Sequence, residues 1–148
     1  MRKFFICKGF ENKDVILPKR GTKYSAGYDL SSIEDVIIPA HCMKLVPTGV
    51  KACMEDDEVL LIYPRSSLGR KKSLMLSNNV AVIDADYFSN PDNDGHIMIN
   101  LYNFSDVDQK IEKGERFAQG IFTKYLIVDD DIASSTTRSG GFGSTGNK

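Results

Sequence analysis

Two aspartates stand close together after an apolar run in the segment NNVAVIDADY, residues 78–87. In an extended chain, Asp84 and Asp86 would project from the same face, because side chains alternate along a strand. A semi-buried carboxylate at the end of such a run can accept a proton from water or help to hold Mg²⁺. The same pattern also describes a strand end with two solvated acids, so it indicates a site only in company with other groups.

A second segment, YPRSSLG (residues 63–69), has groups that suit an anion. Arg65 presents a planar fork of donors that matches phosphate oxygens. Ser66 and Ser67 offer hydroxyls, and the start of a short helix, expected near residues 67–73, offers free N–H groups. The alternative is a helix cap beside a surface arginine, and these residues alone do not decide between the two.

Two other polar segments are weak signals when taken singly. Asp29 follows a glycine in SAGYDLSS (residues 25–32), which a polar turn would also explain. Arg116 and Gln119 border an apolar strand in GERFAQGIF (residues 114–122). The two histidines of the chain lack cysteine or acidic partners at ligand spacing, which argues against a zinc site or a Ser-His-Asp triad. Any chemistry is therefore expected to rest on carboxylates, arginines and a hard metal.

The C-terminal segment combines flexibility with spaced chemical groups. From residue 134 to 146, eleven of thirteen residues are Ser, Thr or Gly, so this stretch cannot order itself by burial. Arg138 and Phe142 interrupt it, and Gly143, Ser144 and Thr145 follow. Glycine lets the backbone approach a phosphate, and an aromatic ring can stack on a base. We expect a mobile arm that closes over a nucleotide.

Short strands are the elements that must position these groups. Helical periodicity is nearly absent, and apolar runs separated by turn residues recur, which is the all-β pattern. Extended runs are expected at residues 4–7, 59–63, 80–83, 96–104 and 116–128, with a surface loop at residues 90–95. The expected fold is an all-β jelly-roll barrel or sandwich with at most one short helix. Residues 1–133 would form its core and residues 134–148 the flexible arm.

Bulk properties narrow the classes of partner. The chain has 148 residues, 41% hydrophobic and 26% charged, which suits one soluble domain. Its net charge of -1 lacks the basic surplus expected of a protein that holds polymeric nucleic acid. No apolar stretch approaches the roughly 18 residues of a membrane span. Three cysteines without a C-x-x-C pair are expected to be reduced packing residues in a cytoplasmic protein.

Taken together, five segments resemble the motifs of the trimeric dUTP pyrophosphatases, the dUTPase family. In order they read AGYDL, PRSSLG, VIDADY, GERFAQ and RSGGFGSTG, and they run from Ala26 to Gly146. One such motif would be weak evidence, whereas five in order over nearly the whole chain are strong evidence. The resemblance implies a jelly-roll homotrimer with sites at subunit interfaces, where the arm comes from a neighbour. It also implies hydrolysis of dUTP to dUMP and pyrophosphate with Mg²⁺, which limits uracil in DNA and supplies dUMP.

The resemblance also implies roles for particular residues. Asp84 would orient and deprotonate the water that attacks the α-phosphorus, and Asp29 would hold a water of the Mg²⁺ shell. Tyr87 would pack under the deoxyribose and leave no room for a 2′-hydroxyl. The remaining substrate-binding residues would be Arg65, Ser66, Ser67, Arg116 and Gln119 at the phosphates, Asn78, Val82 and Ile83 at the polar edge of uracil, Phe142 over uracil, and Arg138, Gly143, Ser144 and Thr145 in the closing arm.

Some positions depart from the family pattern, and two other functions stay open. Ser67 and Ala81 stand where the family commonly has glycine, Gly69 stands where alanine is common, and the loop after Tyr87 is longer than usual. One alternative is a dCTP deaminase, which would share the fold and the triphosphate site. Another is a nucleotide-sensing protein that signals to a protein partner through its arm, a role that the sequence does not report.

Overall fold

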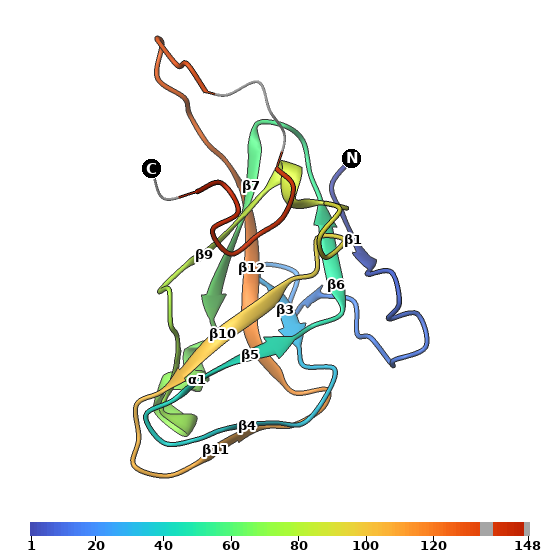
Figure 1. The fold of residues 1–148 in the computed structure, drawn as a ribbon. Helices are drawn as coiled ribbons and strands as arrows, with labels where there is room; N and C mark the ends of the chain where they lie inside the picture. Colours follow the sequence, from blue (N-terminus) through green and yellow to red (C-terminus); the bar gives the residue numbers. More distant parts are fainter. Residues whose placement is uncertain (134–137, 147–148) are drawn as a thin grey trace.

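A computed structural model of the chain describes residues 1–133 and 138–146. Short strands make up most of the regular structure (Figure 1). The elements are β1 (Lys3–Ile6), β2 (Lys19–Arg20), β3 (Tyr28–Ser31), β4 (Val36–Ile38), β5 (Met43–Pro47), β6 (Val50–Cys53), β7 (Glu58–Pro64), α1 (Ser66–Lys72), β8 (Leu74–Leu76), β9 (Ala81–Asp84), the 3-10 turn η1 (Ala85–Tyr87), β10 (Met98–Asn103), β11 (Gln109–Ile111) and β12 (Arg116–Lys124). The protein is an all-β jelly roll with one short helix, as the sequence predicts.

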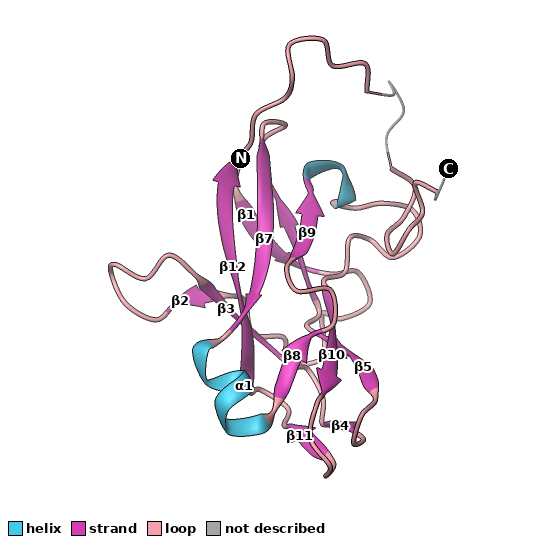
Figure 2. Ribbon diagram, turned by 90° about the vertical axis from the view of Figure 1, so that its left-hand side faces the viewer, coloured by secondary structure: helices cyan, strands magenta, loops and turns pink. Residues whose placement is uncertain are grey.

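The largest sheet has five strands in the order β2-β3-β12-β7-β9. Three smaller sheets, β5-β10-β8, β1-β6 and β11-β4, complete the described part of the fold. In the largest sheet the two edges, β2-β3 and β9, stand on opposite sides of β12 and β7 (Figure 2). This order decides which of the candidate residues can meet within one chain.

Strand β10 illustrates how the apolar alternation produces a two-sided strand. Ile99, Leu101 and Asn103 are buried, whereas Met98, Asn100 and Tyr102 are only partly covered. Asn103 is accommodated inside because its amide donates to the carbonyl oxygens of Ile38 and Val107 at 2.9 and 2.7 Å. A buried amide without such partners would be costly.

The helix α1 begins and ends within a residue of the predicted segment. Ser73 terminates it in the left-handed conformation with φ 52°, and its N–H donates to the carbonyl oxygen of Gly69. Arg70, Lys71 and Lys72 occupy the last turn, where cations favour the helix dipole. Leu68 is the buried residue that ties the helix to the core.

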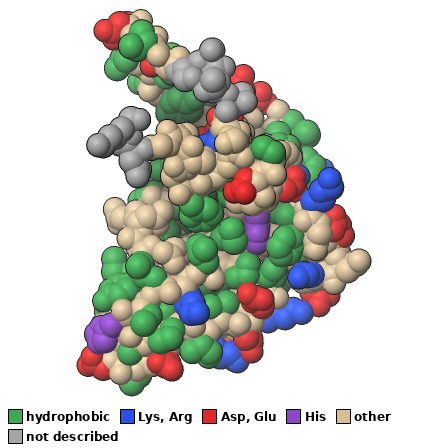
Figure 3. Space-filling model, in the orientation of Figure 1, with side chains coloured by type: hydrophobic (Ala, Val, Ile, Leu, Met, Phe, Trp, Pro, Cys, Tyr) green, Lys and Arg blue, Asp and Glu red, His purple; other side chains and the backbone are tan. Residues whose placement is uncertain are grey.

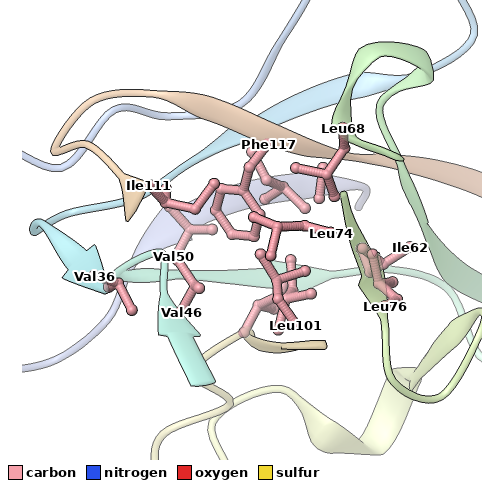
Figure 4. Close-up of a cluster of buried hydrophobic side chains, with 14 of the residues drawn as sticks. Val36, Val46, Val50, Ile62, Leu68, Leu74, Leu76, Leu101, Ile111 and Phe117 are labelled. Carbon is pink, nitrogen blue, oxygen red and sulfur yellow. The ribbon is translucent and has the colours of Figure 1, made fainter. Parts of the chain in front are cut away.

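One continuous apolar core lies between the sheets (Figure 4). Phe117 of β12 is its largest fully buried side chain, and Leu74, Leu101 and Ile111 approach it from three other strands. Leu68 joins this cluster from α1. Because close packing holds β7, β8, β10 and β12 against each other, the loops at their ends are held in defined positions.

Strand β12 is shorter than the sequence predicts. The run rich in apolar residues continues to residue 128, but β12 ends at Lys124. Lys124 pairs with Glu58 at the start of β7. One further backbone bond forms, from the N–H of Tyr125 to the carbonyl oxygen of Asp57 at 3.2 Å, and there the turn before β7 ends the pairing. Leu126 is 97% exposed and Ile132 95% exposed, so this apolar segment finds no cover within the described residues.

The surface departs from expectation in two other places. Cys7 is buried, but Cys42 is exposed, so the prediction that all three cysteines serve packing is wrong for Cys42. Hydrophobic side chains gather over β4 and β5 on the lower part of the face in Figure 3, where Ile37, Met43 and Leu45 are exposed. In the part of the chain that is described, no helix is long and apolar enough to cross a membrane.

Candidate functional site

A cavity of about 270 Å³ opens between β9, η1, β10 and the C-terminal segment. Its size is close to the lower end of small-ligand pockets, roughly 300 Å³. The residues lining it are Ser77, Asn78, Ala81, Val82, Ile83, Tyr87, Ile97, Met98, Ile99, Asn100, Arg138, Gly141 and Phe142. We call it the base cavity, because a flat ring with a polar edge would find both apolar walls and amide groups there.

A tight turn between β8 and β9 presents backbone groups to the base cavity. Asn79 has φ 65°, a left-handed conformation that asparagine tolerates better than most residues. The N–H of Asn79 donates to the carbonyl oxygen of Leu76 at 3.2 Å, and the N–H of Val80 donates to that of Asn78 at 2.8 Å. The polar edge of a ligand would therefore meet a rigid hairpin at this wall.

Tyr87 forms another wall of the base cavity and is almost entirely buried. Its hydroxyl donates to the carbonyl oxygen of His96 at 2.8 Å and accepts from Nδ2 of Asn93, also at 2.8 Å. Burial raises the pKa of the phenol, so the hydroxyl keeps its proton across the physiological range. The ring is therefore held from behind while its other surface faces the cavity.

Asp84 and Asp86 do not share a strand face, because β9 ends at Asp84 and η1 begins at the next residue. The C-terminal segment brings them together instead. Arg138 pairs with both carboxylates, through Nη2 to Asp84 and through Nε to Asp86 at 3.2 Å. The backbone N–H of Arg138 also donates to Asp86 at 3.1 Å. One guanidinium thus bridges two acids and leaves one negative charge, in a depression of about 420 Å³ that shares Arg138 with the base cavity.

The other predicted residues cluster in a separate depression of about 200 Å³. Asp29 of β3 is its centre: Arg65 Nε lies 3.1 Å from one carboxylate oxygen, and Arg116 Nη1 lies 3.1 Å from the other. Ser66 and Gln119 complete the lining. Two arginines against one acid leave a net positive charge, and their outward donors suit an anion with several oxygens. We call this cluster the anion cluster.

Gly27 explains part of the AGYDL segment. A Cβ atom on Gly27 would lie 2.2 Å from Oε1 of Gln119, so only glycine lets β3 and this side chain approach so closely. Gln119 in turn donates to the carbonyl oxygen of Pro64 at 3.1 Å. Ser67 lies next to the cluster, in a smaller hollow with Arg65 and Arg116.

Within one chain the base cavity and the anion cluster are far apart. Asp29 pairs with Gln119, which pairs with Tyr63 of β7, whereas Asp84 pairs with Val59 of β7. The two aspartates are therefore three strand spacings and four residues apart, which at about 4.8 and 3.3 Å amounts to roughly 20 Å. No small ligand spans both groups within a single copy of the chain.

The rest of the arm is only partly described. Phe142 lies at the mouth of the base cavity and is 67% exposed, and Gly143, Ser144 and Thr145 are exposed. Residues 134–137 and 147–148, which belong to the predicted arm, lie outside the described residues. Figure 2 shows the described segment beside β9 and η1. The aromatic ring is thus positioned to cover a ligand in the cavity.

Several residues that line the base cavity were missed by the sequence reading. Asn100 is the most informative, because it is a polar residue between the apolar residues of β10 and its carbonyl oxygen accepts from the N–H of Ser77 at 2.9 Å. The sequence signal for Asn100 was a polar residue within an apolar strand. Gly141 carries no such signal, yet a Cβ atom there would lie 2.7 Å from the Tyr87 ring.

The fold and the two clusters define a class: an all-β jelly-roll protein with sites for an apolar ring and for an anion. The dUTPase family model matches residues 13–146. The deoxyuridine 5′-triphosphate nucleotidohydrolase of Lactococcus lactis is 48% identical over 147 residues, 99% of this chain and 98% of that protein. The enzyme of that name from Arabidopsis thaliana is 40% identical over 97% of this chain and 83% of its own length.

Solved structures agree with this placement. The dUTPase of Streptococcus mutans has 46% identity and a TM-score of 0.82, covering 86% of this chain and 98% of that one. A dUTPase mutant of Staphylococcus bacteriophage 80alpha has a TM-score of 0.72 at 23% identity over 99% of each chain, a likeness of fold alone. The chain belongs to the dUTPase family.

Proposed function

We propose that the protein is a dUTP diphosphatase, which hydrolyses dUTP to dUMP and pyrophosphate. The observation that carries this proposal is the base cavity next to a depression that contains a carboxylate, Asp84, with Arg138 lining both. A nucleoside seated in the cavity would direct its phosphates past that carboxylate. Membership of the dUTPase family supports the assignment. The product dUMP is the precursor of dTMP, and removal of dUTP limits uracil in DNA.

Asp84 is the proposed general base. It would orient and deprotonate a water that attacks the α-phosphorus, so that pyrophosphate leaves in line. In the structure Arg138 pairs with this carboxylate. A base needs a free lone pair, so Arg138 would exchange Asp84 for the phosphates when substrate binds, and the arm would close in the same movement.

The anion cluster is the proposed phosphate site. Arg65 and Arg116, with Ser66, Ser67 and Gln119, would contact phosphate oxygens. Among the described residues no group of three or more His, Cys, Asp or Glu could cage a metal ion. This fits Mg²⁺, which keeps several waters and binds mainly to substrate phosphates, with Asp29 holding one of those waters. When bound, Mg²⁺ would neutralise charge on the phosphates.

The base cavity accounts for the proposed selectivity. Asn78, Val82 and Ile83 would present the β8–β9 hairpin to the polar edge of uracil, and Phe142 would cover the ring. Cytosine would leave polar groups of the hairpin unpaired, which is a large penalty. Thymine would be rejected by shape, because its methyl group needs room. Gly143, Ser144 and Thr145 would close with Arg138 over the phosphates.

The proposed active form is a homotrimer with sites shared between subunits. Its support is geometric: Asp29 of the anion cluster and Asp84, next to the base cavity, are roughly 20 Å apart in one chain. An anion cluster of one subunit beside a base cavity of the next would complete a site. Residues 1–133 would act as the core and residues 134–148 as the arm. The composition supports a cytoplasmic location and a small-molecule substrate rather than a polynucleotide or a membrane.

Pyrophosphate release from dUTP, measured beside dTTP, dCTP and UTP, tests this function. We expect dUTP to be hydrolysed far faster than the other three with Mg²⁺, and the rate to collapse with EDTA. Ammonia release from dCTP would instead indicate a deaminase. Tight dUTP binding without pyrophosphate release would indicate a sensor, and a pull-down with a non-hydrolysable analogue would then identify its partner.

A further inference from the structure

The segment that follows η1, residues 88–96, is a compact loop to which the proposed chemistry assigns no role. We call it the Tyr87 loop. Ser89, Asp94 and Gly95 all have positive φ, so the chain turns tightly. Asp94 anchors the loop to the body: its carboxylate accepts from Nζ of Lys51 at 2.7 Å and from the N–H of Lys8 at 2.8 Å. The expectation of a surface loop at residues 90–95 is only partly correct: Pro91 and Asp92 are exposed, the next two residues are half-buried, and Asn90 and Gly95 are buried.

Two asparagines tie the Tyr87 loop to the residue that precedes it. Asn90 Nδ2 donates to the backbone carbonyl oxygen of Tyr87 at 2.8 Å and to Oδ1 of Asn93 at 2.9 Å. The same Oδ1 accepts from the N–H of Gly95 at 3.1 Å. A Cβ atom on Gly95 would lie 2.7 Å from the Tyr87 carbonyl oxygen, so glycine is needed for the loop to close this tightly.

The hydrogen bonds determine which way the Asn93 amide faces. A phenol has one proton, and that of Tyr87 is given to the carbonyl oxygen of His96, which can only accept. The Tyr87 oxygen must therefore accept from Asn93, and Nδ2 lies 2.8 Å from it. Oδ1 of Asn93 is meanwhile occupied by two donors. A carboxylate in place of this amide would set an acceptor against an acceptor.

The position of Tyr87 makes this network relevant to selectivity. Its ring lines the base cavity, and Asp84, the proposed base, stands three residues earlier in the adjoining depression that shares Arg138 with that cavity. The sugar of a bound nucleotide must lie between the base and the phosphates, which places it beside this ring. A ring excludes a 2′-hydroxyl only while it cannot move aside.

We propose that Asn93 is a positioning residue that holds the Tyr87 ring in place and thereby sets the preference for deoxyribose over ribose. This inference rests on the proposed function. It deepens that function by making the long loop a determinant of sugar selectivity. Asn93 acts through Tyr87 and touches no reacting atom.

The test compares kcat/KM for dUTP and for UTP in Asn93→Asp, a nearly isosteric change that replaces the donor with a charged acceptor. We expect the dUTP-to-UTP ratio to fall about tenfold, through a rise in UTP hydrolysis and in KM for dUTP. The value of kcat for dUTP should change less than about twofold. Asn12→Asp, the same change at an exposed residue of the N-terminal turn, should leave the ratio unaltered.

Tyr87→Phe and the double variant complete the cycle. Tyr87→Phe removes the acceptor that Asn93 serves, so it should lower the ratio similarly, and Asn93→Asp should add little to it. An unaltered ratio in folded Asn93→Asp, or two effects that simply add, would overturn the inference. If Asn93→Asp does not fold, the measurement on Tyr87→Phe is decisive. An unaltered dUTP-to-UTP ratio in Tyr87→Phe would overturn the inference equally. Wild-type protein that released no pyrophosphate from dUTP would overturn the proposed function as well.

Discussion

Asp84 owes its candidate role to where it stands. It ends β9, its side chain is 44% exposed, and it shares a depression next to the base cavity with Asp86 and Arg138. It is thus open to solvent on one side and next to a ligand cavity on the other. Its partner cation is Arg138 of the C-terminal segment, so the proposed role as a base requires that Arg138 releases the carboxylate.

Replacement of Asp84 by Asn should separate binding from turnover. The amide keeps the shape of the side chain but cannot take a proton from water, so turnover of dUTP should fall by about 10²- to 10⁴-fold. Titration with a non-hydrolysable dUTP analogue should show affinity within a few-fold of wild type. Asp86→Asn is the matched control, and its turnover of dUTP should fall much less. Near-normal turnover of Asp84→Asn would mean that another group is the base.

His96 gives the protein a pH-dependent stability. Burial lowers its pKa to about 4, and its Nε2 accepts from the N–H of Gly49 at 2.9 Å, which requires a neutral ring. In the unfolded chain the pKa is about 6.5, so below that pH the unfolded state binds a proton that the folded state refuses. This contribution lowers the free energy of unfolding as the pH falls from about 6.5 to 4, and it is absent above 6.5.

Urea unfolding at pH 7 and pH 4.5 would measure this effect. His96 should account for a loss of about 2–3 kcal/mol between the two pH values. His96→Gln, which retains an acceptor for Gly49, should lose that part of the pH dependence. His41→Gln, at an exposed position, should retain it. An unchanged pH dependence in His96→Gln would show that the imidazole is not the group responsible.

The C-terminal segment is an element whose position depends on small residues. Gly141 packs on the edge of the Tyr87 ring, and Gly140 is buried, where a Cβ atom would lie 3.1 Å from Asp92. Only a chain without side chains at these points can lie so close to η1 and the Tyr87 loop. The arm therefore docks through its glycines and presents Phe142 at the cavity mouth.

Deletion of the chain from Ser139 onward should cut turnover strongly without unfolding the core. The deleted residues contribute nothing to the buried apolar cluster, so the melting temperature should change little. Loss of the ring and of the closing donors should lower kcat/KM for dUTP about 100-fold. Phe142→Ala should cause part of this fall in kcat/KM, since stacking on a base contributes about 1–3 kcal/mol. An unchanged rate in the truncated protein would mean that the arm has no catalytic role.

At the scale of the whole molecule, the anion cluster and the base cavity, the two proposed half-sites, lie apart. The anion cluster lies toward the β2-β3 edge of the largest sheet and the base cavity beside β9 at the other edge. Apolar residues are exposed over β4 and β5, and Leu126 and Ile132 are almost fully exposed after β12. An assembly would bury these surfaces and bring the two half-sites of different copies together.

Mixing two inactive variants should restore activity if sites are shared. Asp84→Asn damages the base half and Arg65→Ala damages the anion half, so each alone should be nearly inactive. In randomly mixed oligomers, about one site in four would join an intact half from each parent. Co-expression followed by a dUTP hydrolysis assay measures this fraction. Recovery no greater than the sum of the two parents would place the whole site within one chain.

Local patterns were sufficient for much of the architecture. The helix α1, the strand β10 and the turn at Gly114 with φ 80° follow from neighbouring residues, because hydrogen bonds and alternation act over a few positions. The five motifs indicated the family because their order along the chain can be read directly. The early end of β12 could not be read, since it depends on where a distant partner strand begins.

What only the tertiary structure decided is which of the chemical groups meet. The sequence by itself determined the all-β class, the family and the types of residue at the site. Strand order separated Asp29 from Asp84. The docking of the C-terminal segment joined Asp84 to Arg138, and the fold of the Tyr87 loop placed Asn93 behind the Tyr87 hydroxyl. The physical reason is that these contacts join positions far apart in the chain or within irregular loops. No local periodicity encodes them, and only packing of the whole core sets their distances.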